Sequence, residues 1–433
     1  MISRRTREAG FLVAPAAIGM LGAVSVASAE ADGLDLGPVP AVALLIGVFA
    51  VIHLSLRAFA PHADPYLLPL VGLLVAVGLV ELSRIDPALA RDQAIWVSVG
   101  AAVFVGVLVL LRDHRVLQHY RYLIGLGAVG LLVITMVFGT RINGAKLWIP
   151  IGGGQTVQLG ELAKVLMVIF LAGYLRDRRE VLAIPTSRVL GVPLPPIRHL
   201  APVMLFVGAA LVAVVVLNDF GTALLFVGVL LAMLFLATGR VAYPAVGFGL
   251  FAVGSVLVYL AVPRINDRVT SWLSPFDHPQ TLGYQMVQSL YALGDGGIVG
   301  PGLGRGFLVN ADGSTPIPEL RTDFIFSAVA SELGYVGAIG VLLVFVLVAY
   351  RGFVIAAQAN DGFSKLLAGG LTVVLAFQAF LIVAGIVRLI PLTGVTLPFM
   401  SYGGSSVVTN FGLVALLLVV SHRSRLPARA ETT

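Results

Sequence analysis

The 433-residue sequence contains no cysteine and few charged residues. Without cysteine, the chain has neither a disulfide framework nor a thiolate metal site. Charged residues make up 12% of the chain, whereas a soluble protein carries roughly 25%. So few charges cannot cover a water-facing surface, and 58% of the residues are hydrophobic. These proportions exclude an ordinary soluble domain and indicate a protein that lies in a membrane.

The hydrophobic residues occur in uninterrupted runs of roughly 18 to 22 residues. At about 1.5 Å per residue, a helical run of this length crosses a hydrocarbon layer of about 30 Å. We therefore predict an all-α polytopic membrane protein with about 12 transmembrane helices. The predicted spans are residues 10–29, 39–60, 65–83, 94–111, 121–139, 157–175, 199–217, 220–238, 241–262, 323–350, 365–387 and 404–421.

The distribution of Lys and Arg over the loops predicts the orientation of these helices. Eighteen of the 28 basic residues lie on the side of the N-terminus, and nine lie on the opposite side. Short cytoplasmic loops carry the excess of Lys and Arg in membrane proteins, so both termini are expected in the cytoplasm. No basic patch is interleaved with aromatic residues, so the net charge of +6 does not indicate nucleic-acid binding.

We predict three parts: an N-terminal transmembrane hairpin over residues 1–60, a membrane core over 61–421 and a cytoplasmic tail over 422–433. The longest outer loop, residues 263–322, belongs to the core, and long loops with little regular structure are usually functional. The first span also fits a cleavable signal peptide, but an apolar run of about 20 residues favours a retained span. The outer face is therefore where a functional site is expected.

Polar groups lie before and within the sixth predicted span. Glu161 and Lys164 are three residues apart and share a helix face, so they can pair. Charges within a span are costly and usually face a cavity or a partner, although a structural pair that orients two helices also fits. Lys146 and Trp148 lie in the preceding loop, where a lone Trp is more simply an interfacial anchor.

The long outer loop contains an Asp–His pair in a turn bounded by prolines. Asp277 or His278 could act as a general base, and either could bind a divalent cation such as Mg²⁺ or Mn²⁺. Asp and Pro are equally common in structural turns, so both interpretations stay open. A short amphipathic run follows at residues 284–293, and Arg321 and Asp323 place charges near the tenth span.

Between the last two predicted spans, residues 388–406 form an apolar stretch that is interrupted by Pro and Gly and contains Ser401 and Ser405. Irregular backbone at membrane depth is tolerated only where it is buried in protein or lines a cavity. We therefore expect this stretch to dip back into the protein. Carboxylates, basic groups and broken helices at the outer face together suit a substrate with an apolar tail and an anionic headgroup.

These motifs together resemble the SEDS family of cell-wall proteins, which includes RodA, FtsW and SpoVE. The resemblance covers about residues 60–421. Its motifs are Asn143-Gly144-Ala145-Lys146-Leu147-Trp148, Gln158-x-x-Glu161-x-x-Lys164, Asp219-x-Gly221-Thr222, Gly283-Tyr284-Gln285-x-x-Gln288-Ser289, Thr322-Asp323-Phe324-Ile325-Phe326, Glu332-Leu333-Gly334 and the run from Pro391 to Ser406. The additional N-terminal hairpin is similar to that of actinobacterial-type RodA and would explain twelve spans where the family usually has ten.

The resemblance implies a peptidoglycan glycosyltransferase of the bacterial cytoplasmic membrane. Such an enzyme polymerises lipid II: the 4-hydroxyl of an acceptor GlcNAc attacks the anomeric carbon of a donor MurNAc, and undecaprenyl pyrophosphate leaves. A carboxylate would accept the hydroxyl proton, and cationic groups or a metal would stabilise the pyrophosphate. The resemblance also implies a class B penicillin-binding protein as partner. The predicted substrate-binding or cavity residues are Glu161, Lys164, Trp148, Lys146, Tyr284, Gln285, Gln288, Arg321, Asp323, Ser401 and Ser405.

The sequence departs from the family pattern at the expected catalytic position. The family's catalytic Asp directly precedes the Pro, six residues ahead of the Tyr of the Gly-Tyr motif. Here His278 occupies that position, and Asp277 is one residue earlier. Three explanations stay open: Asp277 acts as the base after a one-residue shift, His278 acts as the base, or polymerase activity is reduced. We favour Asp277, because a loop can absorb such a shift.

Two other functions stay open at this point. A flippase or another transporter for a lipid-linked precursor would also suit twelve spans, but the sequence lacks two similar halves. The long outer loop also suits chemistry at the outer surface better than alternating access. The second is a non-catalytic cell-wall scaffold, which the His278 substitution suggests. Transport would move the substrate without forming polymer, whereas a scaffold would bind a partner and do neither.

Overall fold

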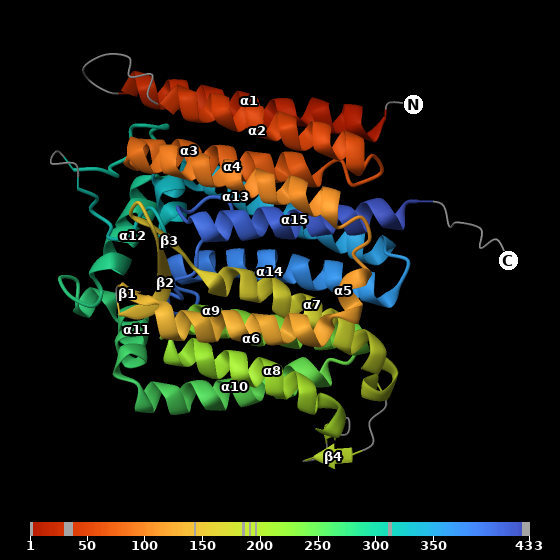
Figure 1. The fold of residues 1–433 in the computed structure, drawn as a ribbon. Coiled ribbons are helices and arrows are strands. Elements are labelled where there is room, and N and C mark those ends of the chain that lie inside the picture. Colours follow the sequence, from red (N-terminus) through yellow and green to blue (C-terminus); the bar gives the residue numbers. More distant parts are fainter. Residues whose placement is uncertain are drawn as a thin grey trace.

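The structure, a computed structural model, describes residues 3–29, 38–142, 144–183, 187–189, 192–194, 197–310 and 314–426. Within these residues the chain is mostly helical, and the long helices lie side by side as a bundle (Figure 1). The predicted all-α membrane fold is therefore confirmed. Asn143 of the first motif and residues 427–433 of the predicted tail lie outside the described residues.

The helices and strands follow one another as α1 (Arg4–Ala29), α2 (Pro38–Phe59), α3 (Leu67–Ile85), α4 (Pro87–Leu110), α5 (Val116–His119), α6 (Arg121–Phe138), β1 (Thr140–Ile142), β2 (Ala145–Gly152), β3 (Gln155–Val157), α7 (Leu159–Ala183), β4 (Ser187–Val189), β5 (Val192–Leu194), α8 (Ile197–Val216), α9 (Phe220–Thr238), α10 (Ala242–Ala261), α11 (Pro263–Leu273), the 3-10 helix η1 (Pro275–Asp277), α12 (Tyr284–Asp295), α13 (Ile325–Gln358), α14 (Gly362–Ile386) and α15 (Gly404–Ser424).

Every predicted span overlaps a long helix. Among the described residues, nine helices are long and apolar enough to cross a membrane, namely α1, α2, α3, α4, α6, α9, α13, α14 and α15. The remaining three predicted spans coincide with α7, α8 and α10. The apolar parts of α8 and α10 are shorter, over Leu200–Val216 and Ala242–Val256, and α7 carries charges at both ends. The number twelve and the orientation stay predictions.

The centre of the bundle is formed by α3, α14 and α15. In these helices 78%, 78% and 72% of the most apolar 18 residues are buried, against 22% in α6. Large apolar side chains face outward along α1, α2, α6 and α10, as lipid contact requires. The N-terminal hairpin joins this bundle through α1 against α3 and α2 against α4.

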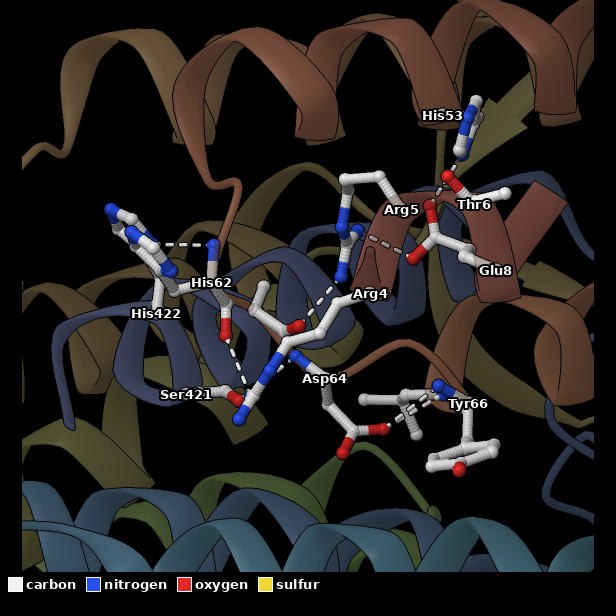
Figure 2. A network of polar contacts seen from close by, with 12 residues as sticks. Arg4, Arg5, Thr6, Glu8, His53, His62, Asp64, Tyr66, Ser421 and His422 are labelled. Carbon is white, nitrogen blue, oxygen red and sulfur yellow. Dashed lines mark hydrogen bonds and ion pairs between the residues drawn. The ribbon is translucent and has the colours of Figure 1, made fainter. Parts of the chain in front are cut away.

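The described start and end of the chain meet at one end of the bundle (Figures 1 and 2). Arg4 donates to the carbonyl of His62, and the backbone N–H of His62 donates to Nδ1 of His422 at 3.2 Å. The described start and end of the chain therefore lie on the same side of the bundle, as the distribution of Lys and Arg predicts. Buried charges strengthen the junction, since Arg5 pairs with Glu8 at 2.5 Å and Glu8 contacts Nδ1 of His53 at 2.6 Å.

The opposite end carries the connections that were predicted to lie outside (Figure 1). Strands β1, β2 and β3 form an antiparallel sheet there. Residues 263–322 contain more regular structure than expected, because α11, η1 and α12, with 11, 3 and 12 residues, form a large part of this segment. The predicted amphipathic run over 284–293 is confirmed as α12.

Backbone hydrogen bonds join the outer loop, residues 263–322, to α13. This helix is interrupted at Gly334, whose φ of 65° suits a residue without a side chain. The N–H groups of Tyr335 and Val336 then donate to the carbonyls of Gly297 and Ile298 at 2.9 and 3.0 Å. Backbone groups freed by the interruption are thus satisfied by the loop, which fixes the loop on the bundle.

Candidate active site

A cavity of about 380 Å³ opens at the end of the bundle that is predicted to face outward and lies opposite the described termini (Figure 1); we call this end the outer end. Its lining comes from segments that are far apart in the sequence, which the fold brings together. The lining residues are Trp96 of α4, Ile142, Ala145, Leu147, Trp148, Gly154, Gln155, Thr156 and Gln158 around the β-sheet, Glu161 at the start of α7, Asn218, Asp219, Phe220 and Thr222 of the turn before α9, Arg268 of α11, Glu319, Arg321, Thr322 and Asp323, residues 393–396 and residues 402–406. A cavity of this size is typical of a site for a small ligand or headgroup.

Four carboxyl groups and two guanidinium groups face this space: those of Glu161, Asp219, Glu319 and Asp323, with Arg268 and Arg321. Asp219 caps α9 by accepting from the backbone N–H of Thr222 at 3.0 Å, and burial raises the pKa of its carboxyl. The cavity is therefore lined by charged groups of both signs.

Asp323 lies just before α13, and its side chain is half-buried. Burial, and after it the negative charge of Glu319, raise the pKa of the Asp323 carboxyl to about 7, although Arg268 acts in the opposite direction. A carboxyl group with such a pKa can take up or release a proton near neutral pH. Asp323 is thus a group of the cavity that can change its charge under working conditions.

The stretch between α14 and α15 is confirmed as irregular and buried. Residues 387–403 belong to no helix, and Leu397, Phe399 and Met400 are at most 3% exposed. Helix α11 holds this broken segment from outside the bundle: Nε1 of Trp272 donates to the carbonyl of Arg388 at 2.9 Å, and Nε of Arg388 donates back to Trp272 at 3.1 Å. Irregular backbone at this depth thus lines a cavity, as expected.

Strained backbone gathers around the same cavity. Among the described residues, four that are not glycine have positive φ: Asn218, Glu319, Arg388 and Phe399, with values from 57° to 67°. Asn218 and Glu319 line the cavity, and the other two belong to the broken segment. Such conformations cost free energy and persist where the surrounding structure enforces them, often at functional sites.

Glu161 and Lys164 pair as predicted, with 2.8 Å between Oε2 and Nζ. Only Glu161 lines the cavity, whereas Lys164 is 3% exposed and lies behind it. Nζ of Lys164 also donates to Oε1 of Gln378 at 2.9 Å. The ammonium group of Lys164 is therefore buried between two acceptors. It does not line the cavity, but it contacts Glu161, which does.

The structure brings five predicted site residues together around the cavity: Trp148, Glu161, Arg321, Asp323 and Ser405. Two others make internal bonds instead. Nζ of Lys146 donates to the carbonyls of Met136 and Val137 at the end of α6. Ser401 donates to the carbonyl of Thr322 and accepts from the N–H of Leu397. Both side chains therefore bond backbone groups near the site and do not line the cavity.

The remaining predicted residues lie in the η1–α12 region and do not line the cavity. Asp277 and His278 are exposed, in a turn closed by a 2.9 Å hydrogen bond from the N–H of Gly283 to the carbonyl of His278. Within the described residues, neither side chain forms a hydrogen bond or an ion pair. Tyr284, Gln285 and Gln288 belong to α12.

Some residues in or behind the wall of the cavity were missed from the sequence. Nε1 of Trp96 donates to Oε1 of Gln155 at 3.1 Å, which ties α4 to β3 beside the cavity, but a Trp within a span carries no specific signal. Glu319 lies in a loop without a motif. Gln378 did carry a signal, because it is a polar residue within a long apolar run of α14.

Carboxylate and phosphate oxygens are the ligands that Mg²⁺ and Mn²⁺ prefer. Among the described residues, no three His, Asp or Glu side chains come close enough together to hold a metal ion. The donor set therefore does not fit a cage made by the protein alone. It fits an ion that one or two carboxylates share with the phosphates of a substrate.

The comparisons with known proteins agree over most of the chain. The model of the FtsW/RodA/SpoVE family, described as cell cycle protein, matches residues 65–426. The peptidoglycan glycosyltransferase RodA of Mycobacterium tuberculosis is 39% identical over 398 residues, which are 89% of this chain and 83% of the relative. Stage V sporulation protein E of Bacillus subtilis is 32% identical over 374 residues, which are 84% of this chain and 98% of the relative.

Two solved structures have the same fold. The rod shape determining protein RodA of Thermus thermophilus matches with a TM-score of 0.60 and 26% identity, over 84% of this chain and 98% of that one. A chain from a peptidoglycan synthase complex, described as coordinating polymerization and crosslinking, matches with a TM-score of 0.68 and 27% identity. The match covers 84% of this chain and 99% of that one. The chain therefore belongs to the FtsW/RodA/SpoVE family.

Proposed function

We propose that this chain is a peptidoglycan glycosyltransferase that polymerises lipid II at the outer face of the bacterial cytoplasmic membrane. The observation that carries this proposal is the polar cavity at the outer end of the bundle, which is walled by the motifs of a family whose members include glycosyltransferases. Apolar helix surfaces beside a charged cavity suit a substrate with a long lipid tail and a pyrophosphate-linked sugar.

In this proposal the two guanidinium groups of the cavity, Arg268 and Arg321, bind the pyrophosphate and stabilise the negative charge that grows as it leaves. Arg is suited to this task because its planar fork of donors matches phosphate oxygens. A divalent cation bound beside the pyrophosphate would supply further neutralisation of the same charge, and Asp277 would be its ligand only if His278 is the base. Glu161 would orient the sugar hydroxyls from the cavity wall.

The general base proposed for the acceptor 4-hydroxyl is Asp277, with His278 as its rival. Both groups are exposed and follow α11, whose Arg268 lines the cavity. An exposed carboxylate on the outer loop can meet an acceptor strand that arrives from outside the membrane. Removing a general base lowers a rate by roughly 100- to 10,000-fold, so the two candidates can be separated by substitution.

The test uses the purified full chain with lipid II and Mg²⁺ or Mn²⁺, and separates the products by glycan length. We expect polymer from the wild type and from His278→Ala, and none from Asp277→Ala. Polymer from Asp277→Ala together with its loss in His278→Ala would assign the base to His278. Absence of polymer from the wild type, while a related RodA works in the same assay, would contradict the proposed activity and favour a transporter or a scaffold.

We further propose a class B penicillin-binding protein as the partner that crosslinks the strands. Support comes from the similar chain in the peptidoglycan synthase complex, which coordinates polymerization and crosslinking. Co-purification of this chain with a tagged penicillin-binding protein, and a faster polymerase reaction in the pair than in the chain alone, is the expected result. Equal rates with and without a co-purifying protein would contradict a functional partnership.

A further inference from the structure

Gln378 lies in the middle of α14, is fully buried and lines no part of the cavity. A buried amide needs hydrogen-bond partners on both of its atoms. Oε1 accepts from Nζ of Lys164 at 2.9 Å, and Nε2 donates to the carbonyl of Thr396 at 2.8 Å. One side chain thus joins α7 to the broken segment between α14 and α15.

The partners of Gln378 fix the orientation of its amide. An ammonium group only donates, and a backbone carbonyl only accepts. Turning the amide over would place its NH₂ group against the ammonium of Lys164 and its oxygen against the carbonyl of Thr396. Only one orientation satisfies both neighbours, so Gln378 sets the distance and the direction between Lys164 and Thr396.

Each of the two hydrogen-bond partners of Gln378 is connected to the wall of the cavity. On one side Lys164 pairs with Glu161 at 2.8 Å, and Glu161 lines the cavity. On the other side Thr396 lines the cavity itself, and its hydroxyl lies 2.8 Å from that of Ser406. Gln378 therefore stands behind two opposite parts of the wall and touches neither the space nor a substrate within it.

We propose that Gln378 is a positioning residue for glycan polymerisation: it holds Lys164, and through Lys164 the carboxylate of Glu161, in register with Thr396 of the broken segment. This inference rests on the proposed function. Glu161 is held in place by one charged partner, and that partner is itself held by Gln378. Loss of the amide leaves Lys164 with Glu161 as its partner and removes the hydrogen bond to Thr396. Glu161 and Thr396 are then no longer held at a fixed position relative to each other.

Gln93 of α4 offers a matched control. It is 2% exposed, and it also bonds the broken segment through both atoms of its amide. Nε2 donates to the carbonyl of Ser401 at 3.1 Å, and Oε1 accepts from the N–H of Gly403 at 3.2 Å. Gln93 makes no bond to Lys164 or Glu161. Gln93→Met therefore removes two hydrogen bonds to the same segment without releasing the ammonium group.

The first experiment compares initial rates of lipid II polymerisation by the full chain with its partner for wild type, Gln378→Met and Gln93→Met. Methionine keeps the length and the volume of the side chain and removes both hydrogen bonds. We expect Gln378→Met to lower kcat at least 10-fold with KM changed less than threefold, and at least threefold more than Gln93→Met does. Melting temperatures of the two variants should fall by similar amounts.

The second experiment uses Gln378→Glu, which also covers the case that Gln378→Met does not fold. The ammonium group of Lys164 favours the ionised form of a Glu at this position, which can accept from Lys164 but cannot donate to the carbonyl of Thr396. Gln378→Glu should therefore keep one of the two contacts, and we expect its kcat to fall at least threefold with KM changed less than twofold. A loss of stability alone would lower the amount of active protein without lowering the rate per folded molecule.

A rate of Gln378→Met within twofold of wild type, a loss no larger than that of Gln93→Met, or a rate of Gln378→Glu per folded molecule equal to that of wild type would each overturn the role of Gln378. Wild type without polymer would overturn the proposed function instead. The two failures are thus distinguishable, because the role of Gln378 is judged only against a wild type whose rate is measured in the same assay.

Discussion

The two ends of the bundle both contain buried charges, but they use them differently. At the end where the described chain starts and finishes, Arg5, Glu8 and His53 satisfy one another (Figure 2), and Asp64 pairs with Arg351. At the outer end, carboxylates surround a cavity of about 380 Å³. The charged groups of the first end contact only one another and the backbone, whereas those of the outer end also line a space that a substrate can enter.

The backbone differs in the same way. The described non-glycine residues with positive φ belong to the cavity or to the broken segment behind it, and none belongs to the junction of α1, α2 and α15. Strain is tolerated where the arrangement of groups matters more than stability. The comparison therefore predicts that substitutions at one end change stability and substitutions at the other end change activity.

The largest expected effect is at the junction. Asp64 is fully buried, accepts from the N–H groups of Tyr66 and Leu67, and pairs with Arg351 and with Arg425. Asp64→Ala leaves these two cations without their carboxylate, which should lower the free energy of unfolding by roughly 3–5 kcal/mol. Thermal unfolding in detergent measures this loss. The polymerase rate per folded molecule should stay within threefold of wild type. A larger fall would contradict the expectation that substitutions at the junction change stability and leave activity intact.

A smaller effect is expected from Arg268 in the cavity. Its guanidinium group faces the space and donates to the carbonyls of Leu392 and Thr393 at 3.4 Å. Arg268→Met should lower kcat/KM for lipid II by roughly 100-fold, because a cation that stabilises the departing pyrophosphate is lost. Initial rates over a range of lipid II concentrations measure it. Unchanged kcat/KM would remove Arg268 from the proposed mechanism.

The smallest effect concerns pH. Because the pKa of Asp323 is about 7 in the folded protein, which is above its ordinary value of 3.8, folding favours the protonated form. The ionised form is therefore destabilising, and this cost grows as the pH rises from about 4 to about 7. Asp323→Asn removes the cost. The full pKa difference would correspond to about 2.6 kcal/mol between pH 5 and pH 8, and because the side chain is only half-buried, solvent screening reduces the expected gain in its stability relative to wild type to roughly 1 kcal/mol. Melting temperatures of both proteins at the two pH values check this, and an equal difference at both would contradict it.

The membrane fold could be predicted from the sequence because long apolar runs have few alternatives to crossing a membrane as helices. Each predicted span overlaps a helix, and the Pro/Gly-broken stretch before α15 lies within the protein as expected. The pair of Glu161 and Lys164 follows from helix geometry alone. These features depend on contacts within one segment or on composition, which a sequence displays directly.

The composition of the cavity could be predicted only in part. Trp148, Asp323 and Ser405 lie where the motifs suggested, but Lys146 folds back onto α6, and Ser401 bonds the backbone of Thr322. Where a side chain points depends on which distant carbonyl comes within reach, and the order of residues does not contain that information. The choice between Asp277 and His278 stays a prediction, because both are exposed in one tight turn.

The most direct test compares two ion pairs of the same kind. Glu161–Lys164 and Arg5–Glu8 are both buried and both spaced by three residues, but only the first faces the cavity. The measurement is the rate of lipid II polymerisation for wild type, Glu161→Gln and Glu8→Gln, each normalised to folded protein. We predict a loss of at least roughly 100-fold for Glu161→Gln and a change of less than about threefold for Glu8→Gln. Equal rates for the two variants would contradict the assignment of the outer cavity as the site of polymerisation.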